Sequence, residues 1–313
     1  MNRLTIRRAA PNTVRMDDAT PPTAPREIAL AEEAAAFRVV GPSEGVSRSP
    51  LIFASPHSGR LYPAAMMAAS RLDRQAIRRS EDAHVDELVA AAPDFGHTLI
   101  VAEYARAFLD VNREPWELDP AMFEDELPAF ARARTARVAA GLGAIARIVC
   151  EGQEIYARKL TFAEAEARVT SVHQPYHAAL AALIAETRAA RGVAILIDCH
   201  SMPSAACARN GESCDIVLGD RFGAACSSRV TGRVERALAD MGYRVARNTP
   251  YAGGYTTEHY GRPGRKIHAL QIELSRALYF DEAALTLTEG FARLRADLGR
   301  LFAALAGMDW SAL

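Results

Sequence analysis

Three stretches of the chain that are typical of β-strands each end on a residue suited to metal-assisted hydrolysis. These end residues are His57, His200 and Glu273, and each follows a run of apolar residues. In an open α/β sheet, ligands bind in the crevice beyond the carboxyl ends of the strands, so the three side chains are expected to converge. Two neutral imidazoles and one carboxylate form a three-ligand zinc site with an open position for water. The pattern therefore predicts a metal centre at one edge of a sheet.

The segment Ser55–Gly59 places His57 at the mouth of its strand. Pro56 cannot donate a hydrogen bond to a sheet ladder, so the strand is expected to end there. A single histidine in such a turn is more often satisfied by hydrogen bonds than by a metal. His200 follows an apolar run in the same way, and Asp198 shares its strand face and is placed to orient its ring. Two strand-end histidines together favour metal binding.

A third ligand is expected from the acidic residues that precede the next predicted helix. Ser80 is followed by Glu81 and Asp82, and acidic residues also suit the first turn of a helix, where the macrodipole favours negative charge. Capping and metal binding are compatible, because only one carboxylate has to turn toward the metal. Spacing alone leaves Asp82, Glu81 and His84 as candidates.

Glu273 ends its strand between the apolar residues Ile272 and Leu274. A buried glutamate is costly in free energy unless it is paired or lies near a cation. A purely structural role would be a bridge to Arg276. Beside a metal, Glu273 is instead suited to act as the general base for a bound water. The two histidines favour the second interpretation, because they imply a nearby metal.

Two arginines, Arg106 and Arg113, flank a segment that contains Asp110. A planar guanidinium matches a carboxylate bidentately, which an ammonium group cannot do. We expect Asp110 to hold one arginine in position while the other meets a carboxylate of the substrate. The alternative is that both arginines form structural ion pairs. Arg106 is also a candidate for stabilising an oxyanion.

A glycine-flanked loop, Gly253–Gly261, carries polar groups and suits a flap or a pocket wall. Within this loop, Tyr255 and His259 are candidate substrate contacts. Arg276, outside the loop, is a third candidate. The cluster Pro175–His177 falls within a long helical region, where it is interpreted as a packed or capping element.

Composition excludes several classes of function. The chain has 313 residues, of which 50% are hydrophobic and 24% charged, and its formal net charge is -1. It has no basic stripe for nucleic acid and no polybasic segment for a membrane surface. Its longest apolar stretches are shorter than the ~20 residues that a membrane-spanning helix requires. Five cysteines form no C-x-x-C pair, and this odd number favours free thiols in a reducing cytoplasm over a disulfide framework.

Apolar periodicity predicts an α/β protein with a largely parallel sheet that is covered on both faces. Residues 1–35 are expected to be a flexible extension, and 36–313 one domain. The stretch from 114 to 155 is expected to be partly helical and partly a loop over the active-site edge. The predicted strands lie at about 50–55, 98–103, 193–198, 214–218, 243–247 and 267–273. The predicted helices lie at about 83–92, 162–190, 222–241 and 283–306.

The motifs, taken in order, resemble the N-formylglutamate amidohydrolase family of the histidine-degradation pathway. The resemblance runs from about residue 50 to 280 and rests on motifs that include Ser55–Gly59, Glu81-Asp82, Asp110–Arg113, Pro175–His177, Asp198–Ser201, Gly253–Tyr255, His259–Gly261 and Gln271–Glu273. It implies a three-layer αβα fold of the phosphorylase/hydrolase-like type, with a central mixed, mostly parallel sheet, similar to zinc carboxypeptidases and aspartoacylase. The zinc ligands that it implies are His57, Asp82 and His200, with Glu81 as the alternative carboxylate.

The same resemblance implies that Asn112 and Arg113 grip a carboxylate of the substrate and that Glu273 is the general base. The leading hypothesis is a zinc-dependent, cytoplasmic amidohydrolase that converts N-formyl-L-glutamate to L-glutamate and formate, as a monomer or small homo-oligomer. A carboxypeptidase-like or other N-acyl-amino-acid deacylase would use the same residues with a different pocket. A non-catalytic metal-binding homologue is the third hypothesis, although metal storage needs no base such as Glu273.

Overall fold

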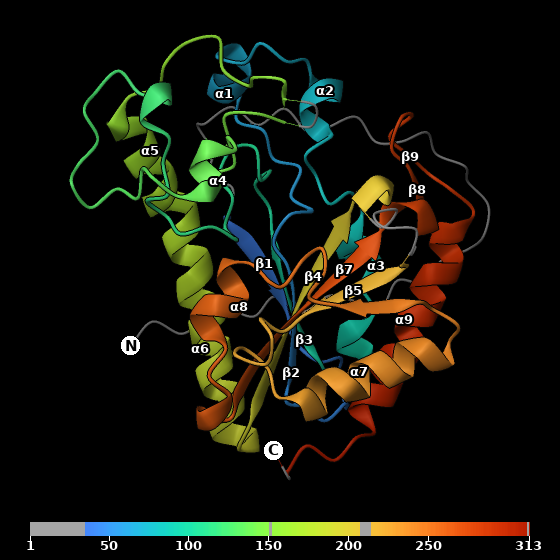
Figure 1. The fold of residues 1–313 in the computed structure, drawn as a ribbon. Coiled ribbons are helices and arrows are strands. Elements are labelled where there is room, and N and C mark those ends of the chain that lie inside the picture. Colours follow the sequence, from blue (N-terminus) through green and yellow to red (C-terminus); the bar gives the residue numbers. More distant parts are fainter. Residues whose placement is uncertain (1–34, 150–151, 207–213, 312) are drawn as a thin grey trace.

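The computed structural model describes residues 35–149, 152–206, 214–311 and 313, so the extension expected at 1–35 lies almost wholly outside the described residues. A seven-stranded sheet with the order β1-β3-β2-β4-β7-β5-β6 forms the centre of the molecule (Figure 1). In that order, the strands are β1 (Phe37–Val40), β3 (Thr98–Ala102), β2 (Leu51–Ser55), β4 (Ala194–Met202), β7 (Ile267–Ser275), β5 (Ile216–Gly219) and β6 (Val245–Arg247).

The four central strands β3, β2, β4 and β7 are parallel to one another. β1 pairs antiparallel with β3, and β5 pairs antiparallel with β7 and parallel with β6. The expectation of a mixed, mostly parallel sheet is therefore confirmed. All residues of β2 and β4 are buried, which explains their near-continuous apolar runs. β1, which was not predicted, is a short and partly exposed edge strand with a weaker signal.

Helices cover both faces of the sheet, and alternate strand residues pack into different cores. Ile52 of β2 belongs to the same core as Leu180 of α6, whereas Phe53 belongs to the core on the other face and packs 4.8 Å, centroid to centroid, from Phe302 of α9. In Figure 1, α6 lies on one side of the sheet and α7 and α9 on the other. The helices are α1 (Ala64–Ala68), α2 (Arg74–Arg78), α3 (Val85–Leu88), α4 (Ala136–Ala139), α5 (Phe162–Arg168), α6 (Gln174–Arg191), α7 (Ser228–Asp240), α8 (Tyr255–Tyr260) and α9 (Gly290–Ala306).

Three of the predicted helices begin later than expected. α3 begins at Val85, because His84 before it adopts a left-handed conformation with φ 59°, and it is only four residues long. α7 begins after Ser227, whose side chain accepts from the amide of Val230, and the preceding Arg221 and Phe222 also have positive φ. α9 begins at Gly290, because a small hairpin of β8 (Phe280–Asp281) and β9 (Thr286–Leu287) occupies the residues before it.

The predicted helix at 162–190 is three successive segments. α5 passes into a π-helical segment, Val169–His173, and this passes directly into α6. The apolar periodicity of the sequence did not reveal the π-helical segment. No helix among the described residues is long and apolar enough to cross a membrane. The short helices α1, α2 and α4 lie together above the carboxyl ends of the central strands (Figure 1).

Candidate active site

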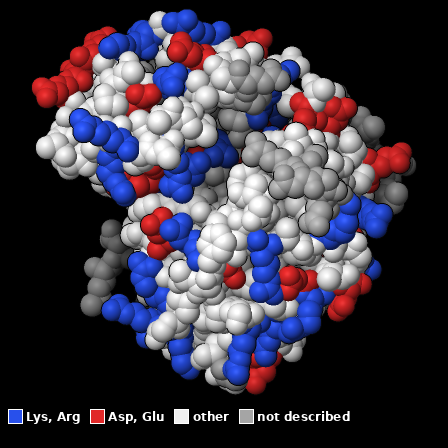
Figure 2. Space-filling model, viewed as in Figure 1, with Lys and Arg blue, Asp and Glu red and all other residues white. Residues whose placement is uncertain are grey.

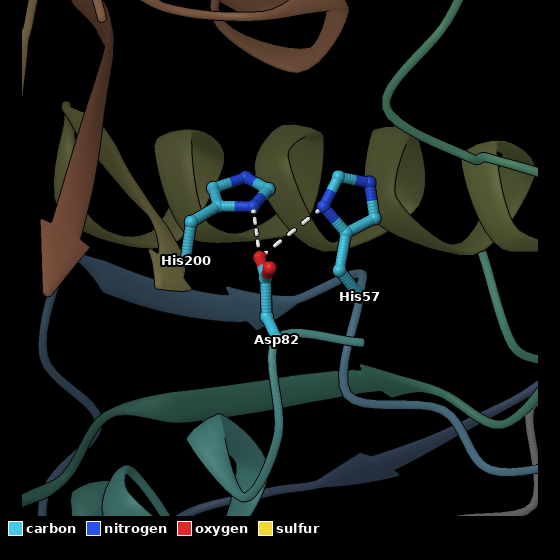
Figure 3. Close-up of side chains that lie close together, drawn as sticks. All are labelled: His57, Asp82 and His200. Atoms are coloured by element: carbon cyan, nitrogen blue, oxygen red, sulfur yellow. Dashed lines mark hydrogen bonds and ion pairs between the residues drawn. The ribbon is translucent and has the colours of Figure 1, made fainter. Parts of the chain in front are cut away.

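Three buried side chains meet at the carboxyl edge of the sheet. His57 follows β2 by two residues, His200 lies in β4, and Asp82 lies in the loop before α3. Asp82 Oδ2 is 3.3 Å from His57 Nδ1 and 3.0 Å from His200 Nδ1, and the two imidazole centroids are 4.6 Å apart (Figure 3). Within the described part of the chain this is the one group of three or more ligand-type residues whose ligand atoms lie within 4.8 Å of one another.

The outer nitrogen of each imidazole is bonded to a second carboxylate. His57 Nε2 is 2.6 Å from Asp110 Oδ1, and His200 Nε2 is 3.0 Å from Asp198 Oδ2. A carboxylate behind each ring favours a proton on Nε2, which leaves the Nδ1 lone pair available for a metal. Two such nitrogens and one carboxylate oxygen are a donor set that fits a divalent metal ion. The orienting role expected for Asp198 is consistent with this contact, whereas the contact of Asp110 with His57 was not foreseen.

Of the three candidates for the third ligand, the structure brings Asp82 to the histidines. Glu81 turns the other way, and its Oε1 accepts from Tyr62 Oη at 2.7 Å. His84 Nδ1 lies 2.9 Å from Glu87 Oε1, outside the cluster. The side chains of Glu81 and His84 are therefore engaged elsewhere.

Arg276 supports Asp82 and does not bridge to Glu273. Its Nη2 donates to the Glu81 carbonyl at 2.7 Å and to Asp82 Oδ1 at 3.3 Å, and its Nε donates to Ser201 Oγ at 3.1 Å. Few donors of Arg276 are therefore left for the substrate contact that the sequence predicts, because most of them already have acceptors in the protein. Arg276 still lines the cavity described below.

The electrostatics of the cluster favour an ionised Asp82 beside a protonated His200 when no metal is bound. Burial opposes the charge on Asp82, but hydrogen bonds from His200 and His57 outweigh it and hold the pKa of Asp82 well below its usual value. Burial likewise disfavours a charged His200, but the carboxylates of Asp198 and Asp82 outweigh it and raise the pKa of His200 well above its usual value. A metal must displace the proton between them, so metal binding is expected to release protons.

Glu273 lies beside this cluster. It is the register partner of His200 across the β4–β7 ladder, and its Oε1 accepts from Gln271 Nε2 at 2.7 Å. Burial raises the pKa of Glu273, the charge of His200 opposes this shift and that of Asp82 adds to it, and the resulting pKa is about 7. A carboxylate with a pKa near neutrality is matched to proton transfer at physiological pH.

A cavity of about 600 Å³ opens over the cluster. Its floor includes His57, Asp82, His200 and Glu273. The segment expected to cover this edge does so in part, because residues such as Leu142 and others of the stretch after α4 line one wall. The cavity is also lined by five arginines, Arg79, Arg106, Arg113, Arg137 and Arg276.

The predicted arginine pair is present, and Asp110 contacts both members. Arg106 Nη2 donates to Asp110 Oδ2 at 2.8 Å, and its Nη1 lies 3.6 Å from Asp82 Oδ1. Arg113 is 3.9 Å from Asp110 and donates through Nε to the Leu142 carbonyl at 3.1 Å. Arg106 is thus held more tightly than Arg113, and both face the cavity.

The side-chain amide of Asn112 is used largely within the protein. Its Oδ1 accepts from the Thr256 amide at 2.8 Å, and its Nδ2 lies 3.3 Å from Asp198 Oδ2 and 3.0 Å from His200 Nε2. Since an Nε2 that carries a proton cannot accept, Asn112 Nδ2 is assigned as a donor to Asp198. Asn112 thereby connects α8 to the carboxylate behind His200.

The structure does not bring Tyr255 and His259 to the cavity. The adjacent Gly253 and Gly254 line it, as expected of this loop, but neither aromatic side chain does. Tyr255 and His259 lie four residues apart on α8 and stack on each other with centroids 5.0 Å apart. They share the helix face that points toward His177, because residues at i and i+4 lie on one side of a helix.

His173 and His177 hold the loop that carries the site. The sequence predicts only a packing or capping role for His177 and no role for His173. His173 Nε2 donates to the Arg113 carbonyl at 2.9 Å, and His177 Nε2 donates to the Val111 carbonyl at 2.7 Å. Their spacing of four residues was the signal in the sequence, but their target lies about sixty residues earlier. His173 is the last residue of the π-helical segment.

The fold and the site together define a class: α/β proteins with a cluster of histidine and carboxylate side chains that could hold a metal ion at the carboxyl edge of a mixed sheet. The model of the N-formylglutamate amidohydrolase family matches residues 49–280. An N-formylglutamate deformylase from Pseudomonas aeruginosa is 31% identical over 243 residues, which cover 76% of this chain and 84% of that protein. The chain therefore belongs to the N-formylglutamate amidohydrolase family.

Other relatives agree with this assignment. An N-formylglutamate deformylase from Pseudomonas putida is 29% identical over 75% of this chain and 83% of its own length. The crystal structure of an N-formylglutamate amidohydrolase from Ralstonia eutropha JMP134 is similar with a TM-score of 0.82 and 38% identity, over 87% of this chain and 98% of that one. A gene product of Agrobacterium tumefaciens, 18% identical with a TM-score of 0.54 over 87% of this chain and 95% of that one, shares the fold.

Proposed function

We propose that this protein is a zinc-dependent amidohydrolase that cleaves N-formyl-L-glutamate to L-glutamate and formate. The observation that carries the proposal is the His57–Asp82–His200 cluster with Glu273 beside it, in one cavity lined by arginines. Membership of the family and the names of its two Pseudomonas relatives support the substrate.

Zinc is proposed as the metal because two imidazoles and one carboxylate are typical of catalytic zinc sites, whereas magnesium prefers oxygen ligands. His57 and His200 would bind through Nδ1 and Asp82 through Oδ2, since these atoms face one another (Figure 3). When bound, the ion would supply a Lewis acid that acidifies a water and polarises the scissile carbonyl.

The protein residues have separate tasks in the proposed reaction. Glu273 takes a proton from the attacking water while the water oxygen bonds to the formyl carbon. Arg106 stabilises the negative charge that develops on the carbonyl oxygen. Glu273 then passes the proton to the amide nitrogen as the carbon–nitrogen bond breaks, and formate and glutamate leave.

Arg113 is proposed to bind the α-carboxylate of the substrate. It lies in the cavity and contacts Asp110, which is bonded to His57, so it is close to the carbon that bears the scissile nitrogen. Asn112 is proposed to act beside it, chiefly by orienting Asp198 and His200.

We also propose that the enzyme acts in the cytoplasm, in histidine degradation, as a monomer or small homo-oligomer. The buried free thiols of Cys199 and Cys226 support a reducing compartment.

The deciding experiment combines metal analysis with a formate-release assay. We expect purified protein to hold about one zinc ion per chain, to release formate from N-formyl-L-glutamate, to lose this activity on dialysis against a chelator, and to regain it with zinc. N-acetyl-L-aspartate and short peptides serve as the comparison panel. Full activity in metal-stripped protein would refute the metal-dependent mechanism, and faster cleavage of peptides or acetylaspartate would refute the substrate.

A further inference from the structure

One of the five arginines in the cavity has no acceptor among the described residues. Arg106 contacts Asp110 and Asp82, and Arg276 contacts Asp82 and its neighbours. Arg113 donates to two backbone carbonyls, and Arg137 lies 3.7 Å from Glu117. The side chain of Arg79 lines the cavity, and no hydrogen bond or ion pair links it to any described residue.

The backbone around Arg79 is held in place on both sides. Arg79 caps α2 through its amide, which donates to the Ala76 carbonyl at 3.3 Å. The next residue, Ser80, donates through Oγ to the Ile77 carbonyl at 2.9 Å. The preceding Arg78 points to Glu81, 3.2 Å away. Of two neighbouring arginines, one is thus used inside the protein and the other is presented to the cavity.

A half-buried guanidinium that has no acceptor among the described residues is suited to an anionic ligand, because such a ligand supplies the missing hydrogen-bond partner. Its planar fork matches a carboxylate. Among the described residues, the cavity lining contains five arginines and three carboxylates, those of Asp82, Asp110 and Glu273. The excess of positive charge suits a ligand with two carboxylates.

We propose that Arg79 binds the side-chain carboxylate of an N-acylated acidic amino acid and thereby selects dicarboxylate substrates. This inference rests on the proposed function, in which Arg113 takes the α-carboxylate next to the scissile amide. No hydrogen bond or ion pair links the Arg79 side chain to His57, Asp82 or His200, so we assign it to the carboxylate that lies farther from the reacting bond.

The test compares substrates that differ only in the distal group. N-formyl-L-glutamate and N-formyl-L-glutamine share the α-carboxylate, but glutamine carries an uncharged amide. We expect Arg79→Gln to lower kcat/KM for formylglutamate roughly 10- to 100-fold, mainly through KM. For formylglutamine we expect a change of less than about threefold. Arg79→Lys should recover part of the preference, because it restores the charge without the fork.

Arg48→Gln is the matched control, because Arg48 is a partly exposed arginine outside the cavity, 3.9 Å from Glu186. It should leave both substrates unchanged. Equal losses on both substrates in Arg79→Gln would overturn the proposal. A loss of kcat/KM that is seen with formylglutamate but not with its α-amide, N-formyl-L-isoglutamine, would also overturn the proposal, because Arg79 would then bind the α-carboxylate.

A binding measurement makes the test independent of turnover. Calorimetry with the metal-loaded protein should show that Arg79→Gln weakens L-glutamate about as much as it raises KM for formylglutamate, while weak L-glutamine binding is unchanged. If wild-type protein fails to cleave formylglutamate but still prefers glutamate through Arg79, the proposed reaction fails and the carboxylate site stands. If cleavage is normal and the preference survives in Arg79→Gln, only the assignment of Arg79 fails.

Discussion

The floor and the rim of the cavity are built differently. On the floor, His57, His200 and Asp82 are almost fully buried, and both nitrogens of each ring are within hydrogen-bond distance of a carboxylate. On the rim, Arg79 is half-buried and has no acceptor among the described residues. Blue side chains gather along the recess between the short helices and the body of the molecule (Figure 2). The floor is organised by contacts within the protein, whereas in our proposal the substrate completes the rim.

This difference separates chemistry from selectivity. Changes to the floor should alter metal content or kcat, because the groups there act on the metal and on the proton in transit. Changes to the rim should alter KM and the preference among substrates. Substitutions in the two regions therefore test whether the effects on chemistry and on substrate preference are separate.

Loss of a metal ligand should have the largest effect. We expect His200→Ala to reduce bound metal to near zero and formate release to background, because two ligands do not hold the ion against solvent. Metal per chain and activity are measured on the same sample. His84→Gln is the control, since His84 contacts Glu87 outside the cluster. A His200→Ala protein that retains stoichiometric metal would show that the cluster is not the metal site.

Glu273→Gln should retain metal but lose catalysis. Removal of a general base lowers kcat by about 10²- to 10⁴-fold. The pH profile sharpens this test. The base must be ionised, so kcat/KM of the wild type should fall as the pH drops through the pKa of Glu273, which is about 7 in the metal-free protein and lower beside a bound cation. The variant should lack this acid limb. An unchanged kcat, or an acid limb that persists in the variant, would assign the base to another group.

The positions of the floor residues could be predicted from the sequence to different degrees. His57 follows β2 and His200 lies in β4, and both strands are buried on both faces. Such strands can be recognised in a sequence by their apolar runs, and parallel strands place their carboxyl ends at one edge of the sheet. Asp82 could not be separated from Glu81 by spacing, because the Glu81 side chain is engaged by Arg78, three residues earlier, and by Tyr62, about twenty residues earlier. Loop side chains are directed by distant partners, and spacing does not encode them.

The rim was harder to predict. The glycine-rich loop predicts that Tyr255 and His259 contact the substrate. In the structure α8 begins at Tyr255, and the two side chains stack on each other outside the cavity lining. The sequence around Arg79 does not indicate a binding residue, because an arginine beside another arginine at a helix end is typical of a solvated surface. Its distinguishing property, the lack of an acceptor, exists only in three dimensions.

Asp110 joins the floor of the cavity to its rim, and Asp110→Asn tests this connection. Asp110 contacts His57 at 2.6 Å and Arg106 at 2.8 Å, so the substitution weakens a metal ligand and the proposed oxyanion group together. We expect a loss of roughly 10- to 100-fold in metal affinity or in kcat/KM. Asp119→Asn is the control, because Asp119 forms a similar ion pair with Arg147 outside this cavity. Equal behaviour of the two variants would remove Asp110 from the site.

The smallest effect is expected from His173, which reaches the site only through the backbone. Its Nε2 donates to the Arg113 carbonyl at 2.9 Å, so His173→Phe should leave that carbonyl without its donor and let Arg113 shift. We expect KM for formylglutamate to rise about three- to tenfold, with kcat and metal content nearly unchanged. His173→Gln retains a side-chain donor and should recover most of the loss. The pH profile should not move, because burial lowers the pKa of His173 and keeps it neutral. If the phenylalanine and glutamine variants are equally impaired, His173 acts through packing and not by positioning Arg113.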